Sequence, residues 1–232
     1  QLGDPDNYRD PVYLNKMNQM LHDWRLRRKR VYGESGSFFD VENFISDARD
    51  RVFMSRVKMN AANKKILFLL DFSSSMSDRQ EDYKRVMTNT LEIFQNIHVP
   101  TAVFGFGAPT VDFFKIKEFN QPWSREQSEQ LAGLQASGGT PLGASLNALD
   151  PYINRYRPKY VVVVTDGQPG DKTSAEEAIK RLSKKTNLVA FGLGNERLGE
   201  DLRNVGFKNL FSTEDVNDIP KQLMPKIAPT KK

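Results

Sequence analysis

Serine and aspartate side chains with an alternating spacing follow the most apolar segment of the chain. Asp71, Ser73 and Ser75 come directly after residues 66–70, with one residue between successive members. This spacing lets one carboxylate and two hydroxyls of a tight loop face the same point. Hydroxyl and carboxylate oxygens, without histidine or cysteine, suit a hard cation such as Mg²⁺, with Mn²⁺ and Ca²⁺ as alternatives. The loop therefore has the chemistry of a divalent-metal site.

Two further loops carry oxygen ligands at positions that would complete such a site. Asp166 follows a second strongly apolar run, residues 160–165, and Thr140 follows two glycines in front of an expected helix. Glycines there let the backbone approach closely. Each motif alone is typical of a turn or a helix cap, but the order of all three favours one shared site. The predicted metal ligands are Asp71, Ser73, Ser75, Thr140 and Asp166.

Short apolar runs alternate with amphipathic helical patterns from about residue 61 onward. Strands are expected over residues 66–70, 101–106, 111–116, 160–165, 188–193 and 207–211. Helices are expected over residues 79–97, 124–134, 142–156, 174–184, 198–205 and 216–226. This alternation favours an α/β fold with a mainly parallel sheet and helices on both faces, in which the second and third strands form a hairpin. In such sheets ligands bind beyond the carboxyl ends of the strands, where the three polar loops lie.

The first 60 residues have a more polar pattern. A helix is expected over residues 11–30 and a shorter one over residues 40–48. Apolar side chains near helical spacing predict that the first helix packs on the α/β core through Tyr13, Leu14, Met17, Met20, Leu21 and Trp24. We therefore divide the chain into an N-terminal helical extension (1–60), an α/β domain (61–228) and a basic tail (229–232).

Composition excludes several classes of protein. The chain has 232 residues, 38% of them hydrophobic, which is enough for one full core and an appendage. It has no cysteine, so disulfides, thiolate zinc sites and a cysteine nucleophile are excluded. The net charge of +5 is spread over the chain, which favours an ordinary surface over a nucleic-acid-binding face. No apolar run approaches the roughly 18 residues of a membrane helix, and no signal peptide is recognisable, so we expect a cytoplasmic protein.

Catalysis by this chain alone is not expected. His22 and His98 are both far in sequence from the three polar loops, so no histidine is placed to act as a base. The chain has no Gly-x-x-x-x-Gly-Lys-Ser/Thr phosphate loop. A Mg²⁺-dependent phosphatase could use Asp71 as its nucleophile, but such enzymes need a second aspartate where Ser73 stands. These observations favour a binding module over an enzyme.

The three motifs together resemble the metal-ion-dependent adhesion site of the von Willebrand factor A family, over about residues 63–225. The resemblance implies a Rossmann-like sheet of about six strands with one short antiparallel edge strand. It also implies that Ser73, Ser75 and Thr140 coordinate the ion through their hydroxyls, that Asp71 and Asp166 contact it directly or through water, and that a partner's Asp or Glu fills the open position. Ser74 departs from the glycine that intracellular members usually have.

A second resemblance concerns the segment upstream of the α/β domain. The basic run ending at Arg30, the Gly36-Ser37-Phe38-Phe39-Asp40 segment and Arg51-Val52-Phe53 are similar to the carboxyl-terminal region of CobT-type cobaltochelatase subunits and NorD-like proteins. That group works with MoxR/CobS-like AAA+ ATPases, which implies an adaptor or co-chaperone subunit. An adhesion or ligand-binding protein and an RNA-associated protein of the same family are the alternatives.

Contacts with the protein partner are expected around the metal and at the basic cluster of the N-terminal segment. The predicted contact residues are Ser74, Met76, Gly139, Gln168, Arg27, Arg28 and Arg30. For the arginines, a solvated helix face is the simpler interpretation, and contact with an acidic surface or with RNA is the more specific one.

Overall fold

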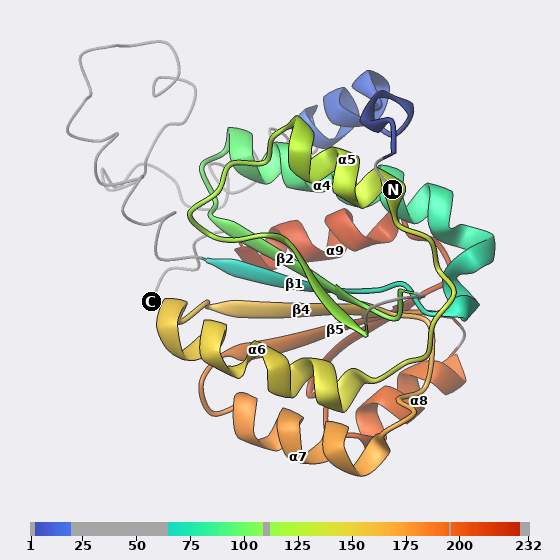
Figure 1. The fold of residues 1–232 in the computed structure, drawn as a ribbon, viewed down its shortest axis with the longest axis vertical. Coiled ribbons are helices and arrows are strands. Elements are labelled where there is room, and N and C mark those ends of the chain that lie inside the picture. Colours follow the sequence, from blue (N-terminus) through green and yellow to red (C-terminus); the bar gives the residue numbers. More distant parts are fainter. Residues whose placement is uncertain (1–2, 20–64, 109–111, 195, 228–232) are drawn as a thin grey trace, which may run out of the picture.

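The computed structural model describes residues 3–19, 65–108, 112–194 and 196–227 as a sheet covered by helices on both faces (Figure 1). The strands are β1 (Ile66–Asp71), β2 (Thr101–Phe106), β3 (Phe113–Lys117), β4 (Tyr160–Thr165), β5 (Asn187–Leu193) and β6 (Asn209–Thr213). The α-helices of the domain are α4 (Gln80–Asn96), α5 (Arg125–Gly133), α6 (Leu142–Tyr156), α7 (Lys172–Leu182), α8 (Glu196–Asn204) and α9 (Asp218–Ile227). The described residues also form two 3₁₀ helices, η1 (Pro5–Asn7) and η2 (Ser74–Arg79).

The six strands follow the order β3-β2-β1-β4-β5-β6. All neighbouring pairs are parallel except β2 and β3, which form the expected antiparallel hairpin at one edge. The predicted α/β fold, mainly parallel with one antiparallel edge strand, is therefore confirmed. The strand order reverses between β1 and β4, because the chain moves from β1 outward through β2 and from β4 outward in the other direction. The loops after β1 and β4 thus leave the sheet at its switch point.

Alternate side chains of the central strands enter two separate cores, as the pleat of a strand requires. In β1, Ile66, Phe68 and Leu70 join the core beneath α4 and α9, whereas Leu67 and Leu69 join the core beneath α6, α7 and α8. All six residues of β1 are buried. This two-sided burial explains why the strand is a continuous apolar run, and it makes Asp71 a carboxylate at the end of a fully buried strand.

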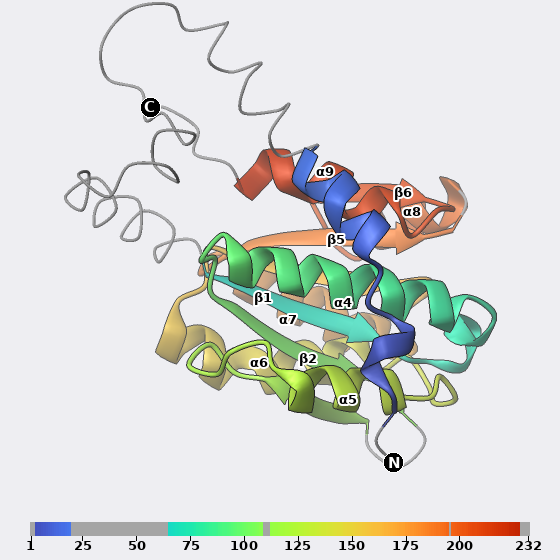
Figure 2. The same cartoon turned by 90° about the horizontal axis from the view of Figure 1, so that it is seen from above.

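The described part of the N-terminal segment lies across α4 and next to α9 (Figure 2). Residues 11–19 are helical, and Leu14 and Met17 are buried in the core beneath α4. Asn89 of α4 binds the backbone on both sides of Arg9, donating to the Tyr8 carbonyl (2.9 Å) and accepting from the Asp10 N–H (3.0 Å). The predicted packing through the first turns of this helix is confirmed.

The remaining predictions for the N-terminal segment and the tail lie outside the described residues. They concern the contacts of Met20, Leu21 and Trp24, the second short helix and the basic tail. Within the described ranges, none of the helices has the length and apolar character that crossing a membrane requires.

Several boundaries differ by one or two residues from the sequence-based expectation. α4 begins at Gln80, one residue later than expected, because the 3₁₀ turn η2 extends to Arg79. β6 begins at Asn209, two residues later than expected, because Phe207 packs into the core beneath α6, α7 and α8 (1% exposed) before the strand starts.

Candidate metal site at the switch point of the sheet

The Asp71 carboxylate joins the ends of the two central strands. Its Oδ1 accepts a hydrogen bond from the Ser73 N–H (2.7 Å), and its Oδ2 accepts one from the Thr165 hydroxyl (2.6 Å). Asp71 is completely buried, and Thr165 is the last residue of β4. The loop after β1 is therefore folded back onto its own aspartate and fixed to the neighbouring strand.

The hydroxyls of this loop continue the chain of contacts to the second aspartate. Ser73 Oγ and Ser75 Oγ are 3.1 Å apart, and the Ser75 hydroxyl donates to Asp166 Oδ1 (2.6 Å). Ser73 is 2% exposed, whereas Ser75 is exposed. Two hydroxyls thus lie between two carboxylates, with the inner side of the cluster buried and the outer side open to the surface.

The loop that carries Thr140 is held against the other two by its backbone. The Ser74 N–H donates to the Gly138 carbonyl (2.9 Å), and the Gly170 N–H donates to the Thr140 carbonyl (3.0 Å). A Cβ placed on Gly167 would lie 3.5 Å from Thr140 Oγ1 and 3.7 Å from Ser75 Oγ. The hydroxyls of Thr140 and Ser75 therefore face the same space beside Gly167, and all five predicted ligand residues lie at one place.

Gly107, the residue directly after β2, is required by this arrangement, and sequence reasoning did not identify it as part of the site. Its φ of +83° lies in the left-handed region. A Cβ on Gly107 would come within 2.7 Å of the Gly139 carbonyl oxygen and of the Ser73 nitrogen. Glycine here lets the Thr140 loop and the Asp71 loop approach each other closely.

Asp171 is a second residue that sequence reasoning missed. Its carboxylate accepts hydrogen bonds from the first turn of α6, at the N–H groups of Gly143 (2.9 Å) and Ala144 (2.8 Å). Asp171 belongs to the loop after β4, and α6 begins two residues after Thr140. The carboxylate therefore ties the Asp166 loop to the Thr140 loop through a helix N-terminus, where negative charge is favourable.

The electrostatics of the cluster favour a cation. Burial raises the pKa of Asp71, and the charge of Asp166 acts in the same direction, against hydrogen bonds from Ser73 and Thr165. Burial also raises the pKa of Asp166, opposed by the Ser75 hydrogen bond and the charge of Arg79. No described lysine or arginine forms an ion pair with either carboxylate. Two close carboxylates without a paired cation are stabilised when a metal ion neutralises them.

The donor set fits an oxygen-binding metal through its hydroxyls. In the described part of the chain, no three His, Cys, Asp or Glu side chains are grouped so that they alone could hold a metal ion. Beside the two carboxylates, the cluster offers the hydroxyl oxygens of Ser73, Ser75 and Thr140. Hydroxyl and carboxylate oxygens suit Mg²⁺, Mn²⁺ or Ca²⁺ by their hardness.

The residues predicted to contact a partner differ in their exposure to solvent. Ser74, Gly139 and Gln168 are exposed around the cluster, and the Gln168 amide donates to the Asp201 carboxylate of α8. Met76 is completely buried in the core beneath α4, so the prediction that its side chain contacts a partner is wrong for this conformation. The apolar side chain that follows the serines anchors the loop to the core instead.

The arginines of the predicted partner-binding cluster, Arg27, Arg28 and Arg30, lie outside the described residues. His22 lies outside them as well. His98 is exposed shortly before β2, at the amino ends of the parallel strands, whereas the polar cluster lies at their carboxyl ends.

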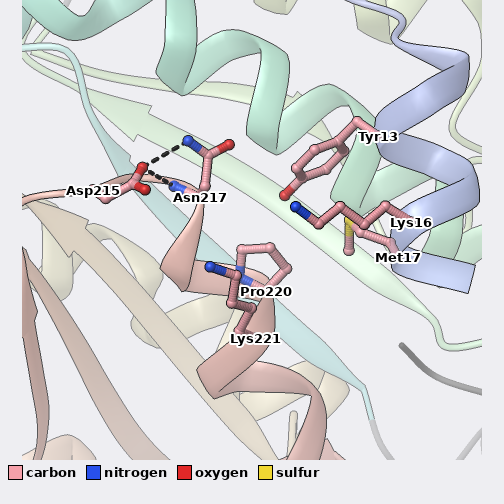
Figure 3. A pocket seen from close by; sticks show the side chains of 7 residues that line it. All are labelled: Tyr13, Lys16, Met17, Asp215, Asn217, Pro220 and Lys221. Atoms are coloured by element: carbon pink, nitrogen blue, oxygen red, sulfur yellow. Dashed lines mark hydrogen bonds between the residues drawn. The ribbon is translucent and has the colours of Figure 1, made fainter. Parts of the chain in front are cut away.

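A separate pocket lies between the N-terminal helix and the region around α9 (Figure 3). Its lining residues are Tyr13, Lys16, Met17, Asp215, Asn217, Pro220 and Lys221. Lys221 is paired with Asp218 (2.8 Å), and Asp215 accepts hydrogen bonds from the backbone and side chain of Asn217. Lys221 and Asn217 are thus engaged locally, whereas the buried Tyr13 hydroxyl has no hydrogen-bond partner among the described residues. None of the lining residues belongs to the three metal-site loops.

Comparison with known proteins agrees with the geometry. The family model of the von Willebrand factor type A domain matches residues 65–224. No curated protein matches the chain in sequence.

Several solved structures have folds similar to the fold of this chain. The pilus adhesin SpaC from Lactobacillus rhamnosus GG has a TM-score of 0.59 at 13% identity, over 71% of this chain and 29% of that one. Manganese-loaded TRAP from Plasmodium vivax has a TM-score of 0.53 at 17% identity, over 72% and 74%. Proximal thread matrix protein 1 from the mussel byssus, with a zinc-occupied MIDAS motif, has a TM-score of 0.51 at 15% identity, over 71% and 47%. The chain thus spans less than a third of SpaC and about half of the mussel protein.

The family model covers more than two thirds of the chain, and the strand order and the polar loops at the switch point agree with it. The chain belongs to the von Willebrand factor type A domain family.

Proposed function

We propose that the domain is a metal-dependent protein-binding module that holds Mg²⁺ and, through it, docks an acidic side chain of a partner. The observation that carries this proposal is the continuous contact of Asp71, Ser73, Ser75 and Asp166, with the Thr140 hydroxyl facing the same space. Ser73, Ser75 and Thr140 would hold the ion through their hydroxyls, and Asp71 and Asp166 would hold it directly or through water.

Two of the similar structures support a divalent metal. The Plasmodium vivax TRAP protein is manganese-loaded, and the mussel byssus protein has a zinc-occupied MIDAS motif. For the present chain Mg²⁺ is our choice, because every proposed ligand is oxygen and none is nitrogen or sulfur. Mn²⁺ has similar ligand preferences and is a useful substitute in experiments.

The residues of the chain explain how such a site would act. The buried Asp71 holds the loop of Ser73 in place, so the hydroxyls do not need to reorganise when a cation binds. Ser75 and the exposed backbone of Gly139 leave the outer side open to a partner. The bound ion supplies a charge that a partner carboxylate can coordinate in an interface partly protected from water, where such a contact is both oriented and strong.

We propose an AAA+ ATPase of the MoxR/CobS type as the partner, with the chain as a non-catalytic, cytoplasmic adaptor. The similarity of the upstream segment to CobT- and NorD-type proteins supports this choice. Adhesion to an extracellular protein and association with RNA are the other outcomes of the test below.

The test is affinity capture with a purified MoxR-type ATPase from the same source, in Mg²⁺ and in EDTA, with ATPase rate as the second readout. Ser75→Ala removes a proposed ligand, and Ser77→Ala is the matched control, because Ser77 is also exposed in η2 but outside the contact network. We expect capture in Mg²⁺ by the wild type and the control only. Capture that persists in EDTA or in Ser75→Ala would contradict the metal-dependent mechanism.

Absence of capture under all conditions would contradict the ATPase as partner. Binding to an extracellular ligand or to RNA in the same format, with the same dependence on Ser75, would then identify the alternative partner.

A further inference from the structure

Arg79 is a cationic side chain at the edge of the polar cluster that the metal-binding proposal does not use. It is the last residue of η2, the turn that contains Ser75, and it is half-buried. Its Nη1 donates a hydrogen bond of 2.8 Å to the carbonyl oxygen of Leu193, the last residue of β5. The guanidinium is therefore held at the carboxyl edge of the sheet and does not extend freely into solvent.

The register of the sheet locates this guanidinium beside Asp166. Thr165 of β4 is paired with Gly192 of β5, so the next residues along the two parallel strands are Asp166 and Leu193. Neighbouring strands lie about 4.8 Å apart. Because Arg79 is bonded to the carbonyl of Leu193, its charge lies next to the outer carboxylate of the cluster, and it acts electrostatically on Asp166.

Among the described residues, Arg79 uses only a small part of its hydrogen-bonding capacity. A guanidinium has five N–H donors in a rigid fork that matches a carboxylate, and the bond to Leu193 accounts for one of them. No Asp or Glu in the described ranges lies within ion-pair distance of Arg79. With Mg²⁺ bound, the positive charges of the ion and of Arg79 together exceed the negative charges of Asp71 and Asp166, so a further anion is favourable there.

We propose that Arg79 determines the specificity of the docking site for an acidic segment. Arg79 binds one carboxylate group of the partner, and the metal binds either the same carboxylate or a second one. This inference rests on the proposed metal-dependent function. Arg79 also repels the bare metal ion, so the site holds Mg²⁺ weakly alone and tightly together with an acidic ligand. Metal and acidic ligand then bind cooperatively, because each supplies the charge that the other needs.

The test uses two probes, Mg²⁺ alone in calorimetry and a fluorescent peptide of alternating aspartate and glycine residues in anisotropy. The same peptide with asparagine in place of aspartate is the ligand control. Arg79→Gln removes the charge, and Arg79→Lys keeps the charge but removes the fork. Arg85→Gln is the protein control, because Arg85 is a surface arginine of α4 paired with Asp82 and lies outside the cluster.

Arg79→Gln should change the affinity for Mg²⁺ and the affinity for the aspartate peptide in opposite directions. We expect Mg²⁺ alone to bind about five-fold more tightly, because a nearby positive charge is removed, and the aspartate peptide to bind about ten-fold more weakly in Mg²⁺. Arg79→Lys should leave Mg²⁺ affinity close to that of the wild type and still weaken the peptide. The opposite signs distinguish a specificity role from simple loss of structure, which would weaken both.

The inference is overturned if Arg79→Gln and Arg79→Lys behave as Arg85→Gln does, or if the asparagine peptide binds the wild type as well as the aspartate peptide does. In either case Mg²⁺ binding by the wild type, lost in Asp71→Asn, would leave the metal-binding proposal intact. If the wild type binds no Mg²⁺ with or without the peptide, the proposed function itself fails and the role of Arg79 fails with it.

Discussion

Replacing Asp171 with alanine tests whether the loops of the site are positioned by a helix cap. Asp171 accepts hydrogen bonds from the N–H groups of Gly143 and Ala144, at 2.9 and 2.8 Å. Both donors belong to the first turn of α6, directly after the Thr140 loop. Without the carboxylate, these two N–H groups lose their acceptor, and the hydrogen bond from the Gly170 N–H to the Thr140 carbonyl is left to tie the two loops together.

The expected loss of stability in Asp171→Ala follows from the two hydrogen bonds that the carboxylate accepts. Loss of a side-chain cap costs about 1 kcal/mol, and loss of a negative charge near a helix N-terminus costs up to about 1 kcal/mol more. We therefore expect the free energy of unfolding to fall by about 2 kcal/mol, which lowers Tm by roughly 4–8 °C for a chain of this size. Metal affinity should fall by about ten-fold, because the hydroxyl of Thr140 is no longer held in place.

Asp10 provides a matched control for the cap. Its Oδ1 accepts hydrogen bonds from the N–H groups of Val12 (2.9 Å) and Tyr13 (3.0 Å) at the start of the N-terminal helix, remote from the three polar loops. Asp10→Ala should lower stability by about 1–2 kcal/mol and leave metal affinity unchanged. Denaturant unfolding in EDTA measures the stability of each variant, and calorimetric titration with Mg²⁺ below Tm measures affinity.

Two results would refute this reasoning. If Asp171→Ala binds Mg²⁺ as tightly as the wild type, the cap does not position Thr140. If Asp10→Ala loses metal affinity to the same extent, the loss reflects global destabilisation and not the contact between the two loops.

Three further substitutions follow from the structure. Gly107→Ala should lower the free energy of unfolding by about 2 kcal/mol and weaken Mg²⁺ binding, because φ is +83° and the new Cβ meets Gly139 and Ser73 at 2.7 Å; calorimetry and urea unfolding measure both effects. Burial lowers the pKa of Lys117 to about 8, below its unfolded value of 10.5, so the unfolded state binds more protons between pH 8 and 10 and stability should rise with pH in that window. Lys117→Met should abolish this rise. Urea unfolding at pH 8 and 10 measures it, and the prediction is contradicted if the free energy of unfolding of Lys117→Met rises between these two pH values as much as that of the wild type. Asn89→Ala should cost about 2 kcal/mol, mainly through the loss of its two hydrogen bonds to the backbone around Arg9, and increase proteolysis near the N-terminus, which mass spectrometry would locate.

Much of the fold could be predicted from the sequence because burial determines the pattern. A strand covered on both faces must be continuously apolar, and residues 66–70 and 160–165 have this pattern. Their shared edge then places Asp71 and Asp166 together without knowledge of any long-range contact. The spacing of Ser73 and Ser75 adds the hydroxyls, and the helix after Thr140 adds the third loop. Local patterns therefore predicted which residues the structure brings together at the switch point.

The contacts that hold the loops together could not be predicted in the same way. Asp171 and Arg79 act through backbone groups of α6 and β5, which are far from them in sequence, and no local pattern specifies such contacts. Met76 was misinterpreted because a methionine next to a polar loop has the same sequence signal whether it is exposed or buried. In the structure the turn η2 points it into the core.

The central claim, that the Asp71 cluster binds a divalent cation, is tested most directly by calorimetric titration of the wild type and Asp71→Asn with Mg²⁺ and Mn²⁺. Asparagine is close in shape and keeps an acceptor for the Ser73 N–H, so the substitution removes the charge with little change in packing. We expect one site per chain in the wild type and at least a ten-fold loss of affinity in Asp71→Asn. Equal binding by both proteins, or no binding by the wild type even with an acidic ligand present, would contradict the claim.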